Sequence, residues 1–296
     1  LREEPLASPG DGEILCETIV TAISPGTELA AWRGLPPLRP GVVYPRLQGY
    51  CNVARLLACR PGVNRIQPGD RVLSLQSHRS HFVIDQASAA YVLPPEARAD
   101  RVVAAYLFHL GYNAVLRSNV RAGHRVLVIG LGALGLTSGA MANLAGARVT
   151  AISGHAKPAG IAQQYGARAV FARDEYEAAG EADIVIATTN GWDDFDLALR
   201  AAAQNATIAC LGFPGRGQAP GEFNPLASEH FYMKQLRIEA VGWSPLENDS
   251  RGFARFNQRD NIAFLANAIE DGRLDPAPIL SGTYPGEDIA QAYRDL

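Results

Sequence analysis

Three glycines in the middle of the chain carry the strongest chemical signal of the sequence. Gly130, Gly132 and Gly135 have the spacing G-x-G-x-x-G, directly after the apolar run RVLVI and directly before a helical pattern. The first glycine permits a tight turn, the second lets a pyrophosphate approach the backbone, and the third lets helix and strand pack closely. The free N–H groups of Ala133 and Leu134, where the helix starts, suit a phosphate. The sequence therefore predicts a dinucleotide site in preference to a plain glycine-rich turn.

The end of the next strand, VTAI at 149–152, predicts which dinucleotide is bound. An NAD site would carry Asp or Glu there, to accept hydrogen bonds from the ribose hydroxyls. This chain has SGHAK at 153–157 instead. A carboxylate repels a 2′-phosphate, whereas a hydroxyl and an ammonium group can bind it. We therefore predict NADP(H), with Ser153 and Lys157 on the 2′-phosphate and His155 assisting; a solvated turn with an incidental lysine is the alternative.

These motifs lie in a region where strand and helix patterns alternate. Such alternation predicts a doubly wound parallel sheet covered by helices on both faces. We expect this Rossmann-type α/β domain to occupy residues 113–242. The expected helices lie at 133–145, 159–165 and 195–204, and the expected strands are HRVLVIG, RVTAIS, AVFA, DIVIATT, TIACLGF and LRIEAVGW.

The first third of the chain has a different texture. Short β-type segments alternate there with Pro and Gly punctuation, which is typical of strands joined by turns. We expect an irregular antiparallel or barrel-like unit over residues 1–112, completed by residues 243–296, so that the α/β domain is set into a unit made of both chain ends. The expected strands lie at 13–24, 52–59, 71–75 and 81–94, and the expected helices at 101–116 and 257–271.

Composition and charge describe a globular protein. The 296 residues are 47% hydrophobic and 19% charged, with a net charge of −3, which gives no electrostatic reason to expect nucleic acid or a membrane as partner. The uncharged stretch 126–147 contains five glycines, so a turn suits it better than a membrane span. Four cysteines without a C-x-x-C pair, and no signal peptide, predict reduced thiols in a cytoplasmic protein. The chain begins in a polar turn and stops inside a helical pattern, so we expect further residues beyond both ends.

The order of these segments resembles the medium-chain dehydrogenase/reductase superfamily over essentially the whole chain. The resembling stretches are GVNRIQPGDRVLSL at 62–75, the nucleotide motif VLVIGLGALGL, ACLGF at 209–213 and the closing segment 272–296. The resemblance implies a GroES-like catalytic domain with an inserted Rossmann domain, hydride transfer to or from a nicotinamide, and often a homodimer paired through edge strands. The form Ser-x-Gly-Thr-Glu at 24–28 is similar to a branch around bacteriochlorophyllide dehydrogenase. From that branch we carry over alcohol and ketone interconversion, and not the substrate.

The zinc ligands of that superfamily are missing at the matching positions. Where zinc-dependent members have a ligand cysteine, this chain has Pro25 or Gly26, and Tyr50 and Cys51 replace a His-Glu pair. Tetrahedral zinc needs three converging protein ligands. For the pair of histidines at 78 and 81 a hydrogen-bonded pair is favoured over a metal site. We therefore predict a zinc-independent enzyme with no bound metal. The soft side chains that remain nearby are Cys51, His78, His81 and His109.

Without a metal, the negative charge that hydride delivery builds on a carbonyl oxygen needs a hydrogen-bond donor about 3 Å away. Tyr50 occupies a lost ligand position, so we predict that its phenol donates there. Thr27 matches the hydroxyl that in this family passes a proton between substrate and solvent. His109 is suited to supply or relay the proton, and Glu28 is expected to hold the wall of the site through an ion pair. The alternatives are structural: Tyr50 fills the space of the metal, Thr27 caps its loop, and His109 is a satisfied core histidine.

The resemblance also implies contacts at two strand ends of the α/β domain. The loop Leu211, Gly212 and Phe213 is expected to run beside the nicotinamide and hold its carboxamide. Thr188 and Thr189 end another strand at the ligand-binding edge of the sheet and are expected to contact the adenosine half.

Three functions remain open on these grounds. The favoured one is an NADPH-dependent ketone reductase, or alcohol dehydrogenase in reverse, acting on a small or medium-sized metabolite. The second is an enoyl or quinone reductase, because the same hydroxyls would stabilise an enolate. The third is an NADPH-binding protein without enzymatic activity.

Overall fold

The chain forms two compact units, which are described separately. The computed structural model describes all residues except 36–43, 220, 222, 243 and 246–256. Unit 1 comprises Leu1–Gly34, Gly41–Tyr106 and Ile262–Leu296, and unit 2 comprises Leu35–Pro40 and Leu107–Asn261.

Two of the limits between the units, at 106/107 and 261/262, lie inside helices. The first falls within α3 (Ala105–Arg117) and the second within α7 (Gln258–Glu270), whereas the sequence places the limits at 112 and 242. A helix continues its backbone hydrogen bonds through such a limit, so no turn residue marks the change in the sequence.

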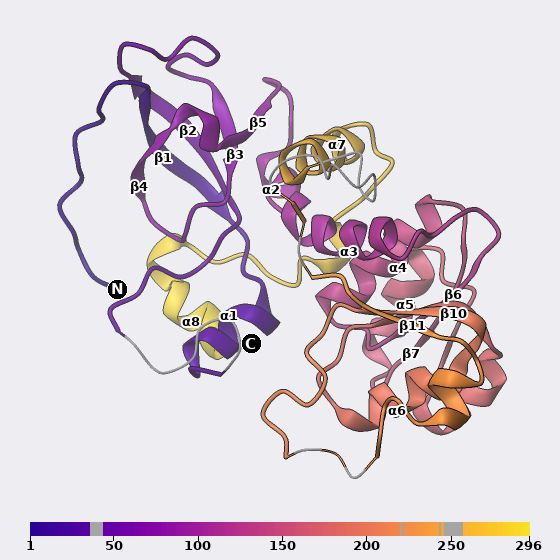
Figure 1. Ribbon diagram of the computed structural model, residues 1–296. Helices are drawn as coiled ribbons and strands as arrows, with labels where there is room; N and C mark the ends of the chain where they lie inside the picture. The colour runs from indigo at the N-terminus through magenta and orange to yellow at the C-terminus, as the bar shows by residue number, and fades with distance from the viewer. Residues whose placement is uncertain (36–43, 220, 222, 243, 246–256) are drawn as a thin grey trace. The chain divides into compact units, whose positions relative to one another are not determined.

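Unit 1 is built around a five-stranded antiparallel sheet with the strand order β4-β1-β2-β3-β5 (Figure 1). Alternate residues of its strands, among them Ile14, Leu56 and Phe82, form a buried core on one face, as the period of two in a strand dictates. Two register shifts along the pairing of β1 with β2 bend the longest strand. The strands are β1 (Glu13–Thr21), β2 (Asn52–Cys59), β3 (Arg71–Ser74), β4 (His81–Asp85) and β5 (Ala89–Leu93).

The unit contains a helix that the strand pattern did not predict. The expected strand 13–24 ends at Thr21, and α1 (Pro25–Trp32) follows. Pro25 has no N–H to give to a sheet and suits the first position of a helix. The Glu28 side chain accepts a hydrogen bond from the N–H of Ser24, the residue that caps this helix. Such a bond satisfies a donor that a helix start leaves open.

Two other expected elements of unit 1 are interrupted. The expected strand 81–94 is split by a short 3₁₀ turn at Gln86–Ser88, where Asp85 accepts a hydrogen bond from the N–H of Ala87. The expected helix 101–116 is broken into two, because the chain turns at Val103 and Ala104. The helices of this region are α2 (Ala99–Val102) and α3, and α8 (Ile289–Arg294) closes the chain.

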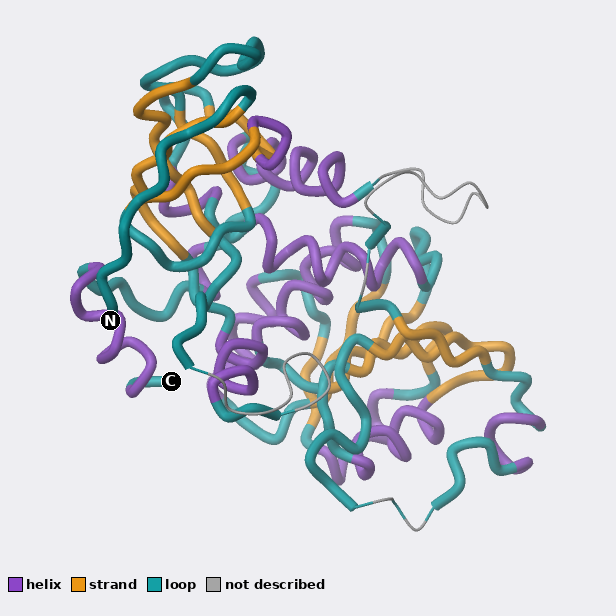
Figure 2. The backbone as a smooth tube through the Cα atoms, turned by 60° about the vertical axis from the view of Figure 1, so that its left-hand side comes forward, coloured by secondary structure: helices purple, strands orange, loops and turns teal. Residues whose placement is uncertain are grey.

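Unit 2 contains the predicted parallel sheet, with helices on both faces (Figure 2). The strand order is β11-β10-β9-β6-β7-β8, and all five pairings are parallel. The order reverses beside β6, which creates the switch point where such sheets bind ligands at their carboxyl edge. The strands are β6 (Arg125–Ile129), β7 (Arg148–Ile152), β8 (Ala169–Phe171), β9 (Ala182–Ala187), β10 (Ala202–Cys210) and β11 (Arg237–Ala240). The helices are α4 (Ala133–Leu144), α5 (Lys157–Gln164) and α6 (Trp192–Ala201).

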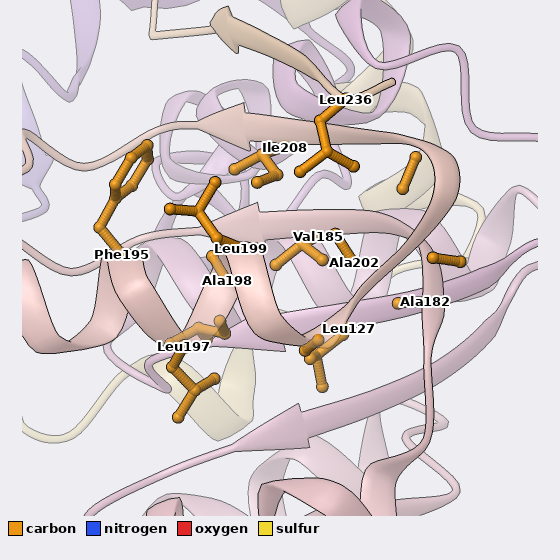
Figure 3. Packing of buried hydrophobic residues seen from close by; sticks show 14 of the residues in the cluster. Leu127, Ala182, Val185, Phe195, Leu197, Ala198, Leu199, Ala202, Ile208 and Leu236 are labelled. Atoms are coloured by element: carbon orange, nitrogen blue, oxygen red, sulfur yellow. The ribbon is translucent and has the colours of Figure 1, made fainter. Parts of the chain in front are cut away.

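The core of unit 2 packs α6 against three neighbouring strands of the sheet. Figure 3 shows Leu127, Val185 and Ile208 from three neighbouring strands packing with Phe195 and Leu199 of α6. Burial of one such side chain is worth about 1.5–3 kcal/mol, so the cluster makes a rigid support for the loops that follow each strand.

The long uncharged stretch 126–147 forms part of this unit and contains most of β6, the glycine turn and α4. Among the described residues, no helix combines the length and the hydropathy that crossing a membrane requires.

Candidate active site

The glycine motif of unit 2 has the geometry that each of its three positions needs. Gly130 has a φ of 89°, in the left-handed region, and a Cβ atom there would lie 2.4 Å from the methyl group of Thr189. A Cβ atom on Gly135 would lie 1.8 Å from the carbonyl oxygen of Gly130. At Gly132 nothing lies within 4 Å of that position. The backbone is therefore open for a phosphate at the second glycine, where α4 begins with Ala133 and Leu134.

The loops that follow β9 and β10 lie against this glycine turn at the same edge of the sheet. The Thr188 hydroxyl lies 2.9 Å from the carbonyl oxygen of Ile129 and 3.0 Å from that of Gly130. The Thr188 side chain thus supports the turn, a role that the sequence did not reveal. A Cβ atom on Gly212 would lie 2.1 Å from the carbonyl oxygen of Thr189, so the two loops are in close contact.

The loop after β10 is tied to the same place by a side chain. The amide oxygen of Asn190 accepts a hydrogen bond from the N–H of Phe213 at 2.9 Å. The N–H groups of Leu211 and Gly212 both donate to the carbonyl of Ala187, at 2.9 Å each. The residues predicted for the two halves of the dinucleotide therefore lie together along the switch point.

The predicted 2′-phosphate site lies in the turn between β7 and α5. The Ser153 hydroxyl donates to the carbonyl oxygen of His155 at 2.9 Å and accepts from the N–H of the same residue at 3.1 Å. Lys157 is the first residue of α5 and is exposed, as is His155. The turn therefore presents the Lys157 ammonium group near the end of β7, whereas the Ser153 hydroxyl donates its proton within the turn.

In unit 1, two hydroxyl side chains and one aromatic ring contact Tyr50. The hydroxyls of Ser24 and Thr27 hydrogen-bond to the hydroxyl oxygen of Tyr50, and the ring makes an edge contact with Tyr106 at a centroid distance of 5.2 Å. Burial raises the pKa of Tyr50 well above its usual range, although the bonds from Ser24 and Thr27 act in the opposite direction. At neutral pH the phenol is therefore protonated and able to donate.

Glu28 lies beside this group with its carboxylate fully engaged. The residue is 2% exposed. Its Oε1 accepts the N–H of Ser24 at 2.8 Å, and its Oε2 accepts from Nε2 of His78 at 2.9 Å and from the hydroxyl of Tyr293. This contact with His78 is an ion pair only when the imidazole carries a proton, so the ion pair expected of Glu28 stays a prediction.

The two histidines at 78 and 81 have separate partners, which corrects the expected pair. The His78 ring contacts Glu28, whereas Nε2 of His81 lies 3.9 Å from Glu17. No pattern in the sequence points to Tyr293, because it lies 265 positions from Glu28 along the chain.

His109 belongs to unit 2, whereas Tyr50, Thr27 and Glu28 belong to unit 1. The His109 side chain is 2% exposed, and its Nε2 lies 3.0 Å from the Ser244 hydroxyl. Burial lowers the pKa of His109 to about 4, so the ring is neutral at pH 7. A buried ring with a hydrogen bond at Nε2 is also what a structural core histidine shows, so the relay role stays a prediction.

The described residues do not offer a donor set that fits zinc. No group of three or more His, Cys, Asp and Glu side chains in this part of the chain is placed to hold a metal ion. Cys51 is fully buried, and burial raises the pKa of its thiol well above the usual range.

Comparison with known proteins gives relatives across the chain. A family model described as zinc-binding dehydrogenase matches residues 133–257. The acryloyl-coenzyme A reductase of Metallosphaera sedula is 26% identical over 100% of this chain and 92% of its own length. An alcohol dehydrogenase of Cupriavidus necator is 27% identical over 71% of this chain and 59% of its own.

Solved structures share the fold of the whole chain. The alcohol dehydrogenase TADH from Thermus sp. ATN1 matches with a TM-score of 0.78 at 20% identity, and the match covers 99% of this chain and 92% of that one. Sequence motifs, relatives and fold agree, and the glycine turn has the geometry of a nucleotide site. Together these matches support a place for the chain in the medium-chain dehydrogenase/reductase superfamily, whose members are nicotinamide-dependent oxidoreductases.

Proposed function

We propose that the protein is a zinc-independent oxidoreductase that uses NADP(H) to interconvert a ketone and a secondary alcohol of a small or medium-sized metabolite. The observation that carries this proposal is the Tyr50 hydroxyl, which two further hydroxyls hold at a position where zinc-dependent members have a ligand. A phenol held in this way can replace a metal ion as the group that stabilises charge on the substrate oxygen.

A bound nicotinamide would supply a hydride for the carbonyl carbon of the substrate, and the glycine turn at 130–135 and the loop at 211–213 would hold that cofactor. Tyr50 donates a hydrogen bond to the oxygen as its negative charge develops and then transfers its proton there. The hydrogen bonds from Ser24 and Thr27 stabilise the phenolate oxygen that results. Thr27 returns a proton to Tyr50 from solvent. Glu28 orients the helix that carries Thr27 and takes no part in the proton transfer.

The choice of NADP(H) rests on the turn after β7. Lys157 presents an ammonium group there, and the sequence of the turn has no carboxylate to repel a 2′-phosphate. The Ser153 hydroxyl would exchange its bond to the His155 carbonyl for one to the phosphate. Charge-assisted bonds to phosphate are the stronger kind of hydrogen bond. NADPH is therefore expected to support faster turnover than NADH.

A second candidate is the reduction of a C=C bond conjugated to a carbonyl. It is favoured by the relative from Metallosphaera sedula, whose similarity covers this whole chain and whose name is that of an acryloyl-coenzyme A reductase. Hydride addition to such a substrate gives an enolate, and the Tyr50 hydroxyl would stabilise that oxygen equally well.

One assay distinguishes the two reactions. The purified protein is given NADPH with a saturated ketone and, separately, with the matching enone. Loss of the carbonyl with formation of an alcohol supports the ketone reductase, and loss of conjugation with the carbonyl retained supports the second candidate. Absence of NADPH consumption across a broad carbonyl panel, with cofactor binding retained, would contradict both.

The variant Tyr50→Phe tests the proposed donor. Loss of one transition-state hydrogen bond typically lowers kcat by about 10²–10³, and this fall is the expected result. Tyr44→Phe is the matched control, because the exposed Tyr44 hydroxyl donates to the backbone carbonyl of Trp32. A Tyr50→Phe enzyme within a few fold of the parent would show that the ring only packs.

A further inference from the structure

The Glu28 carboxylate joins three segments of unit 1 that are far apart in the sequence. It accepts hydrogen bonds from Ser24 at the start of α1, from His78 between β3 and β4, and from Tyr293 in α8. The side chains of Glu28 and His78 are 2% and 4% exposed. A buried carboxylate is stable only when donors compensate for the water it has lost. The Glu28 side chain therefore links the three segments that carry these donors.

The same histidine also supports the backbone that carries Tyr50. The N–H of His78 donates to the carbonyl of Gln48 at 2.7 Å, and the Gln48 side chain donates to the carbonyl of Glu28 at 2.7 Å. Gly49 has a φ of 91°, and a Cβ atom there would lie 2.4 Å from Nε2 of His78. The imidazole therefore lies directly against the residue that precedes Tyr50.

Tyr293 reaches the site from the end of the chain. Its hydroxyl bonds to Glu28 and is also hydrogen-bonded to the Gln48 side chain, and its ring makes an edge contact with His78 at a centroid distance of 6.2 Å. The hydroxyl thus contacts both segments that lead to the Tyr50 and Thr27 hydroxyls.

We propose that His78 and Tyr293 are positioning residues, which act through Glu28 to hold the hydroxyls of Tyr50 and Thr27 in the geometry that hydride transfer needs. The inference rests on the proposed function of Tyr50. Among the described residues, the hydrogen bonds to the Tyr50 hydroxyl come from Ser24 and Thr27. Removal of the His78 or Tyr293 donor is therefore expected to affect the reaction by loosening that geometry.

Tyr293→Phe is the first test, because it keeps the ring and removes one donor to the carboxylate. We expect kcat to fall about tenfold, which corresponds to the loss of one hydrogen bond to a charged group. KM for NADPH is expected to stay unchanged, since the glycine turn lies in unit 2. Tyr284→Phe is the matched control: the exposed Tyr284 also donates to a carboxylate, that of Asp295, at 2.8 Å. An unchanged kcat in Tyr293→Phe would overturn the inference.

His78 is tested with two variants, because leaving a buried carboxylate uncompensated can impair folding. His78→Gln keeps a donor and is expected to retain most of the parental kcat. His78→Leu removes the donor and is expected to lose at least as much as Tyr293→Phe. Equal kcat values for the two variants would contradict a role through Glu28, and Tyr293→Phe remains the test if the Leu variant does not fold.

A double-mutant cycle separates this inference from the proposed function. If Tyr293 acts by positioning Tyr50, its substitution changes kcat about tenfold in the parent and has little effect when Tyr50 is already Phe. Independent, multiplicative effects would overturn the inference and leave the proposed function standing. Parental kcat in Tyr50→Phe alone would overturn the proposed function and this inference with it.

Discussion

Burial decides how the titratable side chains of this protein can act. It raises the pKa of the Tyr50 phenol above its usual range, so Tyr50 is a donor. It raises the pKa of Cys210 to about 11 and that of Cys16 to about 12. Both thiols are therefore protonated at neutral pH and are poor nucleophiles. His109 shows the opposite shift, because burial disfavours the charged form of each group.

The low pKa of His109 predicts a pH dependence of stability. Its pKa is about 4 in the folded protein and about 6.5 in an unfolded chain. Between about pH 4 and pH 6.5 the unfolded chain binds a proton at His109 that the folded protein does not bind. The stability that neutral His109 contributes is therefore fully present above about pH 6.5 and is lost as the pH falls toward about 4. The shift corresponds to about 3 kcal/mol.

Denaturant unfolding of the parent and of His109→Gln checks this prediction. Between about pH 7 and pH 4 the free energy of unfolding of the parent is expected to fall by about 3 kcal/mol more than that of the variant. His155→Gln, at an exposed position, serves as control and is expected to follow the parent. Parallel curves for parent and His109→Gln would contradict the assignment.

At the scale of elements, the turn between β7 and α5 is expected to select the cofactor. It presents Ser153 and Lys157 beyond the end of β7, on the side where the strand ends of the sheet converge. Lys157→Glu places a negative charge there, which is expected to lower kcat/KM for NADPH by about 10–100-fold through lost and reversed phosphate contacts. The value for NADH is expected to stay within a few fold of the parent.

Arg168→Glu provides the matched control for this charge reversal. Arg168 is exposed and precedes β8, so it lies at the opposite end of the neighbouring strand. Equal losses with NADPH and NADH in Lys157→Glu would point to a damaged turn rather than to a lost 2′-phosphate contact, and no loss would show that the lysine is incidental.

At the scale of the whole molecule, metal removal tests the proposed mechanism. Zinc-dependent members depend on three converging ligands, whereas the described residues of this chain hold no such group. Activity and thermal unfolding are therefore expected to be unchanged after dialysis against a chelator, and elemental analysis is expected to find less than stoichiometric zinc. Stoichiometric zinc together with loss of turnover on chelation would overturn the metal-free mechanism.

The sequence by itself determined the class of fold and the position of the nucleotide turn. The spacing of Gly130, Gly132 and Gly135 specifies a left-handed turn and a close helix contact, and both are local properties of the backbone. The alternation of strands and helices after Arg125 likewise predicts a parallel sheet, because each helix buries its apolar side against the sheet between two successive strands.

Only the tertiary structure decided which side chains meet. The sequence pattern predicts a strand up to residue 24, whereas the structure has the helix α1 from Pro25, with a hydrogen bond from the N–H of Ser24 to the Glu28 side chain. His78 and Tyr293 reach Glu28 across 50 and 265 positions of the chain. No periodicity records such contacts, since they exist only when distant segments have packed and the carboxylate has left water.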